Sequence, residues 1–259
     1  MEKVIHYCWF GQNPLPESAI KCIDSWKKFC PDYQIKEWNE SNFDFSQCKY
    51  AVRACELKKY AFLSDYARFK ILYEYGGVYL DTDVELIKGL DEIVEKGPFM
   101  GCEGNYAVAS GLGIGAEPKM EIYKELVELY ENIDFEKDDG SSNVKTVVDY
   151  VTEVFTKYGF KKTDEIQLIK GVYVYPQEYF CPKDVDSGAL NITDNTVSIH
   201  HYDASWFSDS ERYAQVLRKK YRKFLPSKLA GRLAYFVAQC KYIGFRKAVK
   251  NTMRKLKKK

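Results

Sequence analysis

The chain has 259 residues, of which 46% are hydrophobic and 29% charged, a composition that predicts a packed core and excludes a generally disordered protein. The net charge of +2 conceals an asymmetry: residues 212–259 hold 17 Lys and Arg and no Asp or Glu, whereas the preceding 211 residues hold 22 basic and 37 acidic residues. The acidic body argues against nucleic acid as a partner, because phosphate binding requires a basic surface, and the basic tail predicts contact with an anionic membrane surface.

The N-terminal sequence MEKVIHYCWF has neither the basic segment nor the long apolar segment of a secretory signal. We therefore expect a cytoplasmic location and free thiols on the eight cysteines, none of which forms a CxxC pair. The longest apolar run of the tail, LAYFVAQC, is too short to span a bilayer. A membrane contact would thus be peripheral, on the inner face of the plasma membrane.

The N-terminal part of the chain predicts a β-α-β unit. Residues 3–11 have the apolar run of a buried strand, and residues 16–31 have helical spacing that ends at a proline. Residues 33–38 alternate between apolar and polar side chains, as in a second strand. Such a unit is typical of a parallel sheet covered by helices.

A helical region is predicted over residues 49–75, and the two glycines at 76 and 77 supply the left-handed backbone that ends a helix. Residues 78–80 then form a short strand, with Asp81-Thr82-Asp83 at its carboxyl end, the edge where open α/β sheets bind ligands. The helix is indicated by one apolar stripe at helical spacing: Phe62, Tyr66, Phe69 and Tyr73.

The rest of the chain continues as α/β and ends in helices. Pro226 divides the tail into two helical pieces, and we place the boundary of an α/β domain, 1–211, before a basic helical tail, 212–259. The remaining predicted elements are short strand and loop pieces at 98–104 and 111–116, helices at 119–133 and 143–159 around an acidic loop, and strands at 171–176 and 196–201.

Two acidic or charged stretches are candidates for chemistry. Asp81 and Asp83 are oxygen ligands that suit a divalent cation, which can also neutralise a leaving diphosphate; an Asp-x-Asp pair alone is a weak signal. Asp65 and Arg68 are three residues apart, so they project from one helix face. They form either a surface ion pair of little energetic value or a site in which Arg68 contacts phosphate and Asp65 binds sugar hydroxyls.

Two further stretches hold histidine and tryptophan. His200 and His201 are two of only three histidines and precede Ser205 and Trp206; they are either metal ligands or a pair of turn histidines. Trp9, at the end of the first predicted strand, either stacks on a nucleobase or fills the core.

Taken together, the stretches IHYCWFG, SDYARFKILYEYGGVYLDTDV and IHHYDASW resemble, in this order, glycosyltransferase family 32, the DXD-containing sugar transferases of bacterial capsules and surface polysaccharides. The order is also similar to the glucosylating domain of large bacterial toxins. The resemblance covers roughly residues 3–206 and is looser over 115–195. It implies a GT-A fold, a nucleotide-sugar donor (most often a UDP-sugar), Mn²⁺ or Mg²⁺, and transfer with retention at the anomeric carbon.

The resemblance also implies roles for the N-terminal motif and the helix before the DXD stretch. Trp9 would stack on the uracil, with the Cys8 backbone beside it. Asp65 would bind the donor-sugar hydroxyls, and Arg68 would contact the sugar and the diphosphate. Tyr79 would lie near the ribose.

The metal site is implied by the same resemblance. Asp83 would ligate the metal directly, and Asp81 would contact the ribose or sugar and the metal sphere. A histidine completes the site: His200, which follows an apolar residue as in the family pattern, is favoured, and His201 is the alternative.

Two more sets of residues carry roles that the resemblance implies. Ser205 and Trp206 would close over the β-phosphate. Asn105, Ser110 and Gly111 lie where the family has an acceptor-side loop.

The predicted function is a retaining transfer of a sugar to a glycan or lipid-linked glycan. No carboxylate is identifiable as a nucleophile, which favours front-face attack. One alternative is a sugar-nucleotide-binding protein without activity. Another is a haloacid-dehalogenase-type phosphatase, although Glu85 stands where that pattern has Thr or Val.

An apolar stripe in the tail favours membrane binding over a solvated helix or a helix packed on the body. The stripe comprises Leu229, Leu233, Phe236 and Cys240 and is extended by Ile243 and Phe245.

Overall fold

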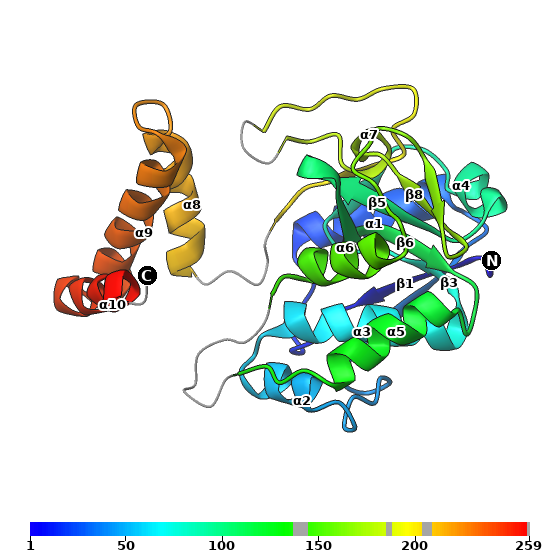
Figure 1. Ribbon diagram of the computed structural model, residues 1–259, viewed down its shortest axis with the longest axis horizontal. Helices are drawn as coiled ribbons and strands as arrows, with labels where there is room; N and C mark the ends of the chain where they lie inside the picture. The colour runs from blue at the N-terminus through cyan, green and yellow to red at the C-terminus, as the bar shows by residue number, and fades with distance from the viewer. Residues whose placement is uncertain (137–144, 185–187, 204–208, 258–259) are drawn as a thin grey trace. The chain divides into compact units, whose positions relative to one another are not determined.

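The structure is a computed structural model that describes residues 1–136, 145–184, 188–203 and 209–257. The chain folds as two compact units, residues 1–202 and 203–259 (Figure 1). The first unit contains the strands and the candidate site, and the second contains only helices in its described part.

A seven-stranded sheet, in the order β2-β1-β3-β6-β5-β8-β7, forms the centre of the first unit's described part. Parallel pairs join β1 to β2, β1 to β3, and β5 to β8, whereas β6 and β7 run antiparallel to their neighbours. Five strands therefore share one direction and end at the same edge. The strands are β1 (Val4–Cys8), β2 (Gln34–Trp38), β3 (Gly77–Tyr79), β5 (Phe99–Glu103), β6 (Ala107–Ala116), β7 (Gln167–Ile169) and β8 (Val172–Tyr175).

Two apolar cores lie on the two faces of this sheet, because successive strand residues point to opposite sides. Val78 packs in one core with α1 and α4, and Tyr79 packs in the other with α3, α5 and α6. This arrangement, visible in Figure 1, confirms the predicted α/β class with a mostly parallel sheet flanked by helices. The helices are α1 (Glu17–Phe29), α2 (Lys49–Glu56), α3 (Tyr60–Tyr75), α4 (Asp91–Lys96), α5 (Glu121–Glu131), α6 (Val147–Lys157) and α7 (Gln177–Phe180).

The helical region predicted over residues 49–75 consists of two helices, α2 and α3. Residues 57–59 separate them, and Lys58 adopts a φ of 55° that interrupts the helical backbone. The end of the region is as predicted: α3 ends at Tyr75, and the following glycines have φ values of 67° and 84°. A Cβ on Gly77 would lie 2.9 Å from the carbonyl oxygen of Val4, so the close pairing of β1 and β3 also requires glycine there.

The short strand and loop pieces predicted between residues 98 and 116 are instead an antiparallel pair, β5 and the ten-residue β6, joined by a short 3-10 turn (Gly104–Tyr106). Glycine inside a strand weakens the strand, because glycine has high backbone entropy and no side chain to pack. Here β6 pairs on both sides, with β3 and β5, and the sheet overrides the local preference. Gly115 is required by packing, because a Cβ there would lie 2.5 Å from the ring of Phe99.

A second, two-stranded sheet was not anticipated. It pairs β4 (Val84–Leu86) antiparallel with β9 (Ser198–His200), which corresponds to the strand predicted over residues 196–201. The pairing joins the segment after β3 to a segment more than one hundred residues later in the chain. The pairing therefore determines which residues near β9 lie beside Asp81-Thr82-Asp83.

His6, the third histidine, is a buried part of the scaffold. Its Nδ1 accepts a hydrogen bond from Nε1 of Trp38 at 3.0 Å, so Nε2 carries the hydrogen and donates to the carbonyl of Gly76 at 3.1 Å. Burial lowers the pKa of His6 to about 4. The neutral imidazole thus links β1, β2 and the end of α3.

We expect His6 to make the protein less stable as the pH falls. Between pH 6.5 and pH 4 the unfolded chain binds a proton that the folded chain excludes, so the free energy of unfolding falls across this window, by about 3 kcal/mol in total. Urea unfolding at pH 7.5 and pH 4.5 measures the difference, with His6→Phe as the control. Equal pH dependence in the wild type and H6F would contradict the assignment.

In its described residues, 209–257, the second unit forms basic helices, as predicted for the C-terminal extension. The predicted piece 227–259 is two helices, α9 and α10, because Gly244 adopts a φ of 85° between them. Within the unit α9 packs against α8, and its alanines at 230, 234 and 238 are buried. None of the described helices has both the length and the apolarity of a membrane span. The helices are α8 (Asp209–Tyr221), α9 (Ser227–Ile243) and α10 (Phe245–Lys257).

Candidate active site

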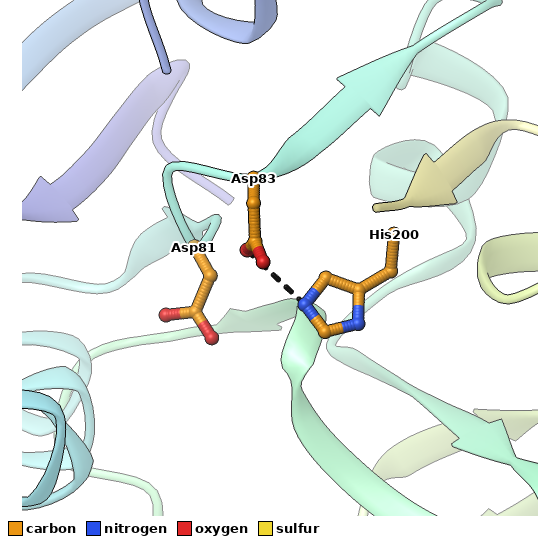
Figure 2. A group of neighbouring side chains, drawn as sticks. All are labelled: Asp81, Asp83 and His200. Atoms are coloured by element: carbon orange, nitrogen blue, oxygen red, sulfur yellow. Dashed lines mark hydrogen bonds and ion pairs between the residues drawn. The ribbon is translucent and has the colours of Figure 1, made fainter. Parts of the chain in front are cut away.

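Two carboxylates and an imidazole meet at the carboxyl edge of the sheet (Figure 2). Asp81 and Asp83 lie in the tight turn between β3 and β4, in which the amide of Val84 donates to the carbonyl of Asp81 at 3.0 Å. Val84 lies opposite His200 in the β4–β9 pair, which brings Nε2 of His200 to 3.1 Å from Oδ1 of Asp83. One ligand atom from each of the three side chains lies within 4.8 Å of the others.

The structure separates the two histidines that the sequence left as alternatives. His200 faces Asp83, whereas Nε2 of His201 lies 2.8 Å from Oε2 of Glu85. Successive residues of an extended chain point to opposite faces. His200 therefore meets Asp83, the residue before β4, and His201 meets Glu85, which lies within β4. His200, and not His201, is therefore the histidine that the fold brings to Asp81 and Asp83.

Arg68 lies buried between two carboxylates, with only 4% of its side chain exposed. Its Nη2 is 3.0 Å from Oδ1 of Asp65 and 3.1 Å from Oδ1 of Asp81. The hydroxyl of Tyr79 also donates to Asp81, at 3.1 Å. The pair on α3 is thus not a surface ion pair, and removal of Arg68 would leave the buried carboxylates of Asp65 and Asp81 without their cationic partner, at a cost of about 3–5 kcal/mol.

Strand β6 forms the other side of this arrangement. The hydroxyl of Ser110 lies 3.4 Å from Nη1 of Arg68, and a Cβ on Gly111 would lie 2.4 Å from Oδ2 of Asp81. The predicted acceptor-side loop is therefore wrong in its local structure, because these two residues are in a strand and lie against Arg68 and Asp81. The side chain of Asn105 lies outside what the structure describes.

The electrostatics of the cluster favour a bound cation. Burial raises the pKa of Asp65 to about 7 although Arg68 opposes the shift, and burial likewise raises the pKa of Asp81. Burial lowers the pKa of His200, but the carboxylates of Asp83 and Asp81 outweigh it, so the net pKa is raised. Burial thus disfavours the charged forms of these carboxylates, and a bound cation would stabilise them. Two carboxylates and an imidazole fit Mn²⁺ or Mg²⁺ in ligand type.

The residues of the N-terminal motif lie at the same edge, because β1 runs parallel to β3. Trp9 follows β1 directly, is half-buried, and donates from Nε1 to the carbonyl of Asn13 at 2.6 Å. Cys8 is buried beside Tyr79, and burial raises the pKa of its thiol to about 12, so the thiol is neutral. Ser205 and Trp206 lie outside the described residues.

Sequence reasoning missed two residues of this region, Glu103 and Tyr202. The ring of Tyr202 lies 4.1 Å from the ring of His200, centroid to centroid, and its hydroxyl donates to Oε2 of Glu103 at 3.2 Å. Two features could have indicated them. Tyr202 is two residues after His200 in the sequence, and Glu103 ends a strand that shares the direction of β3.

Comparison with known proteins agrees with the site. Residues 16–100 match the family described as "Glycosyltransferase sugar-binding region containing DXD motif". This range contains Asp65, Arg68, Asp81 and Asp83 and ends before β6 and β9.

Individual relatives are also glycosyltransferases by name. Inositol phosphoceramide mannosyltransferase 3 of Schizosaccharomyces pombe is 33% identical over 96 residues, which are 36% of this chain and 27% of that protein. The uncharacterized glycosyltransferase L373 of Acanthamoeba polyphaga mimivirus is 26% identical over 198 residues, which are 70% of this chain and 75% of that protein. Among solved structures, the PaToxG glycosyltransferase is 24% identical, with a TM-score of 0.47, over 60% of this chain and 69% of that one.

The first two curated relatives are matched over 27% and 33% of their length, so the chain spans a third or less of each. The family match and the residues it covers nevertheless agree with the motifs in the sequence. Over residues 16–100 the chain is therefore similar to the DXD-containing sugar-binding region of glycosyltransferases, as its sequence motifs predict.

Proposed function

We propose that the chain is a retaining glycosyltransferase that moves a sugar from a nucleotide sugar, with UDP-sugars as the first candidates, to a glycan or lipid-linked glycan in surface-polysaccharide synthesis. One observation carries the proposal: the fold gathers Asp81, Asp83 and His200 within ligand distance of one another, beside the buried Arg68. The S. pombe relative is named for a lipid, inositol phosphoceramide, and this name supports a lipid-linked acceptor.

Asp81, Asp83 and His200 would hold Mn²⁺ or Mg²⁺. When bound, the ion supplies charge neutralisation on the leaving diphosphate. Nε2 of His200 lies 3.1 Å from Oδ1 of Asp83, and Arg68 forms ion pairs with Asp65 and Asp81. Asp81 links the proposed metal ligands to Arg68. One of its carboxylate oxygens can share an ion with His200, and its carboxylate also accepts hydrogen bonds from Arg68 and Tyr79.

Arg68 would donate to the diphosphate from a position that is set before the substrate arrives. Its guanidinium is held by Asp65 and Asp81, so little reorganisation is needed as negative charge develops on the leaving group. Asp65 would accept hydrogen bonds from donor-sugar hydroxyls. Trp9 would stack on the base, and Ser205 and Trp206 would close over the β-phosphate.

Retention would follow from front-face attack. The bond from the anomeric carbon to the diphosphate breaks, the acceptor oxygen forms a bond on the same face, and the acceptor proton passes to the departing diphosphate oxygen. Arg68 stabilises the negative charge that the diphosphate takes with it. Detection by mass spectrometry of a glycosyl adduct on any Asp or Glu would contradict this mechanism.

The test of the function is a panel of nucleotide sugars incubated with the protein, with and without Mn²⁺. We expect hydrolysis or transfer of at least one sugar, dependent on the ion, and a raised melting temperature with that donor, because a ligand that binds only the folded state stabilises it. Binding without turnover would favour the inactive sugar-nucleotide-binding alternative. Absence of both binding and turnover would contradict the proposal, and release of phosphate from a monoester would favour the phosphatase.

We also propose that the second unit holds the protein on an anionic membrane, where a lipid-linked acceptor lies. Residues 212–259 carry 17 basic and no acidic residues, and each Lys or Arg near such a surface contributes about 1 kcal/mol. Large apolar side chains are exposed among them: Phe224 at 83%, Phe245 at 66% and Leu229 at 51%. With the alanines of α9 buried, the apolar stripe predicted from the sequence is left partly or fully exposed on that helix.

The double variant Phe224→Ser/Phe245→Ser should bind anionic vesicles several-fold more weakly than the wild type, because two exposed apolar side chains are lost while the charge is unchanged. Sedimentation with vesicles of phosphatidylserine and phosphatidylcholine measures this. Leu168→Ser is the matched control, since Leu168 is 58% exposed on β7, in the first unit. Binding that is equal in the double variant, or equal on pure phosphatidylcholine, would contradict the proposal.

A further inference from the structure

Tyr202 joins three distant segments beside the candidate metal site. Its ring lies against the imidazole of His200, with centroids 4.1 Å apart and planes at 57°. Its hydroxyl donates to Oε2 of Glu103 at 3.2 Å and lies 2.9 Å from Sγ of Cys181. The end of β9, the end of β5 and the residue after α7 therefore converge on this side chain.

The backbone of Tyr202 is held in an unusual conformation. Its φ is 56°, in the left-handed region that residues other than glycine rarely adopt. Such conformations persist where surrounding contacts determine them, and they concentrate at functional sites. The neighbouring carbonyl of His201 is also fixed, because Nζ of Lys183 donates to it at 2.8 Å. The segment from His200 to Tyr202 is thus held by contacts on both sides.

The imidazole of His200 lacks the restraint that metal-ligating histidines usually have. Such a histidine donates its second ring N–H to a carboxylate, a carbonyl or water, and this bond fixes the orientation of the ring. Nε2 of His200 faces Asp83, and the buried Nδ1 has no hydrogen-bond partner among the described residues. The ring contact with Tyr202 can restrain the rotation of the imidazole in place of that bond.

We propose that Tyr202 is a positioning residue for His200: its ring holds the imidazole with Nε2 toward Asp81 and Asp83, and Glu103 and Cys181 anchor its hydroxyl. The inference rests on the metal site of the proposed function. The ring of Tyr202 would orient the imidazole of His200, as a hydrogen bond at Nδ1 does in other metal-ligating histidines. Tyr202 itself need not touch the ion or the substrate.

Three variants separate this role from a general contribution to folding. Tyr202→Leu removes the ring and the hydroxyl, whereas Tyr202→Phe keeps the ring and removes only the anchor. Tyr179→Leu is the matched control, because Tyr179 packs against the same apolar core but has its ring contacts with Tyr175 and Phe180. The full chain is used throughout, and circular dichroism reports whether each variant folds.

The primary readout is Mn²⁺ affinity without nucleotide, from the electron paramagnetic resonance signal of the free ion. We expect Y202L to raise the Kd at least about 10-fold, as when a group that orients a metal ligand is lost. Y202F should raise it about threefold, as for loss of one hydrogen bond, and Y179L should match the wild type. Electron spin-echo modulation from the imidazole nitrogen should be present in the wild type and Y202F and weaker in Y202L.

A folded Y202L with the wild-type Kd and nitrogen modulation would overturn the inference while leaving the metal site intact. If Y202L does not fold, Y202F decides: a wild-type Kd in Y202F overturns the anchoring role, and a raised Kd supports it. Wild-type protein that binds no Mn²⁺ would instead contradict the metal site of the proposed function, so the two failures are distinguishable.

Discussion

Asp83→Ala and His200→Ala should each lower kcat/KM for sugar transfer by about three orders of magnitude, or about 4 kcal/mol in transition-state stabilisation. Each variant removes one of the three side chains whose ligand atoms lie within 4.8 Å of one another. The cation that would offset the charge of the leaving diphosphate is then bound weakly or displaced. Initial rates over a range of Mn²⁺ concentrations measure the loss, and excess Mn²⁺ should restore part of the activity.

The chain supplies matched controls for these variants in Glu85→Ala and His201→Ala. Both residues are neighbours of the site residues and form their own pair at 2.8 Å, with side chains 42% and 34% exposed. An exposed pair of this kind contributes about 0–1 kcal/mol to stability. We expect both controls to keep wild-type kcat/KM and Mn²⁺ dependence. If His201→Ala and not His200→Ala abolished activity, the assignment of the metal ligand would be wrong.

Gly111→Ala should lower kcat/KM about 100-fold while the protein stays folded. The added Cβ would lie 2.4 Å from Oδ2 of Asp81 and 3.4 Å from Nη1 of Arg68, so the carboxylate must move. Because Asp81 is held by Arg68 and Tyr79, any movement disturbs both the ion pair and the metal cluster. A misplacement of about 1 Å can cost a factor of about 100 in rate.

Gly104→Ala is the matched control for this substitution, since a Cβ on Gly104 meets no atom within 4 Å. It makes the same chemical change just beyond β5, before the strand on which Gly111 lies. We expect wild-type kcat/KM for G104A and, for G111A, a melting temperature within a few degrees of the wild type together with weaker Mn²⁺ binding. Unchanged kinetics in G111A would show that Asp81 is not required in its observed position.

The features that the sequence predicted well are those set by local chemistry. The two glycines at 76 and 77 end α3 because only glycine adopts their positive φ values without strain. The short apolar run after them forms β3, and Asp81 and Asp83 follow it as predicted. Such features depend on neighbours within a few residues, so the order of the residues is sufficient to indicate them.

Predictions failed where a distant partner changed the local outcome. The glycines of β6 argue for a loop, but hydrogen bonding to β3 and β5 on both sides makes a ten-residue strand. The aromatic stripe on α3 suggests one buried face, yet Asp65 and Arg68 are buried as well because the helix packs beside β6 and Asp81. Burial by a neighbouring element cannot be read from helical spacing.

The order of the residues was enough to predict that a DXD pair follows a short strand, that Asp65 and Arg68 share a helix face, and that a basic tail follows an acidic body. The choice of His200 over His201 as the partner of Asp83 required the three-dimensional fold. That choice depends on the antiparallel register of β4 and β9, in which a shift of one residue would exchange the two histidines. The fold also places Tyr202 on His200, since contacts between segments about a hundred residues apart fix that ring.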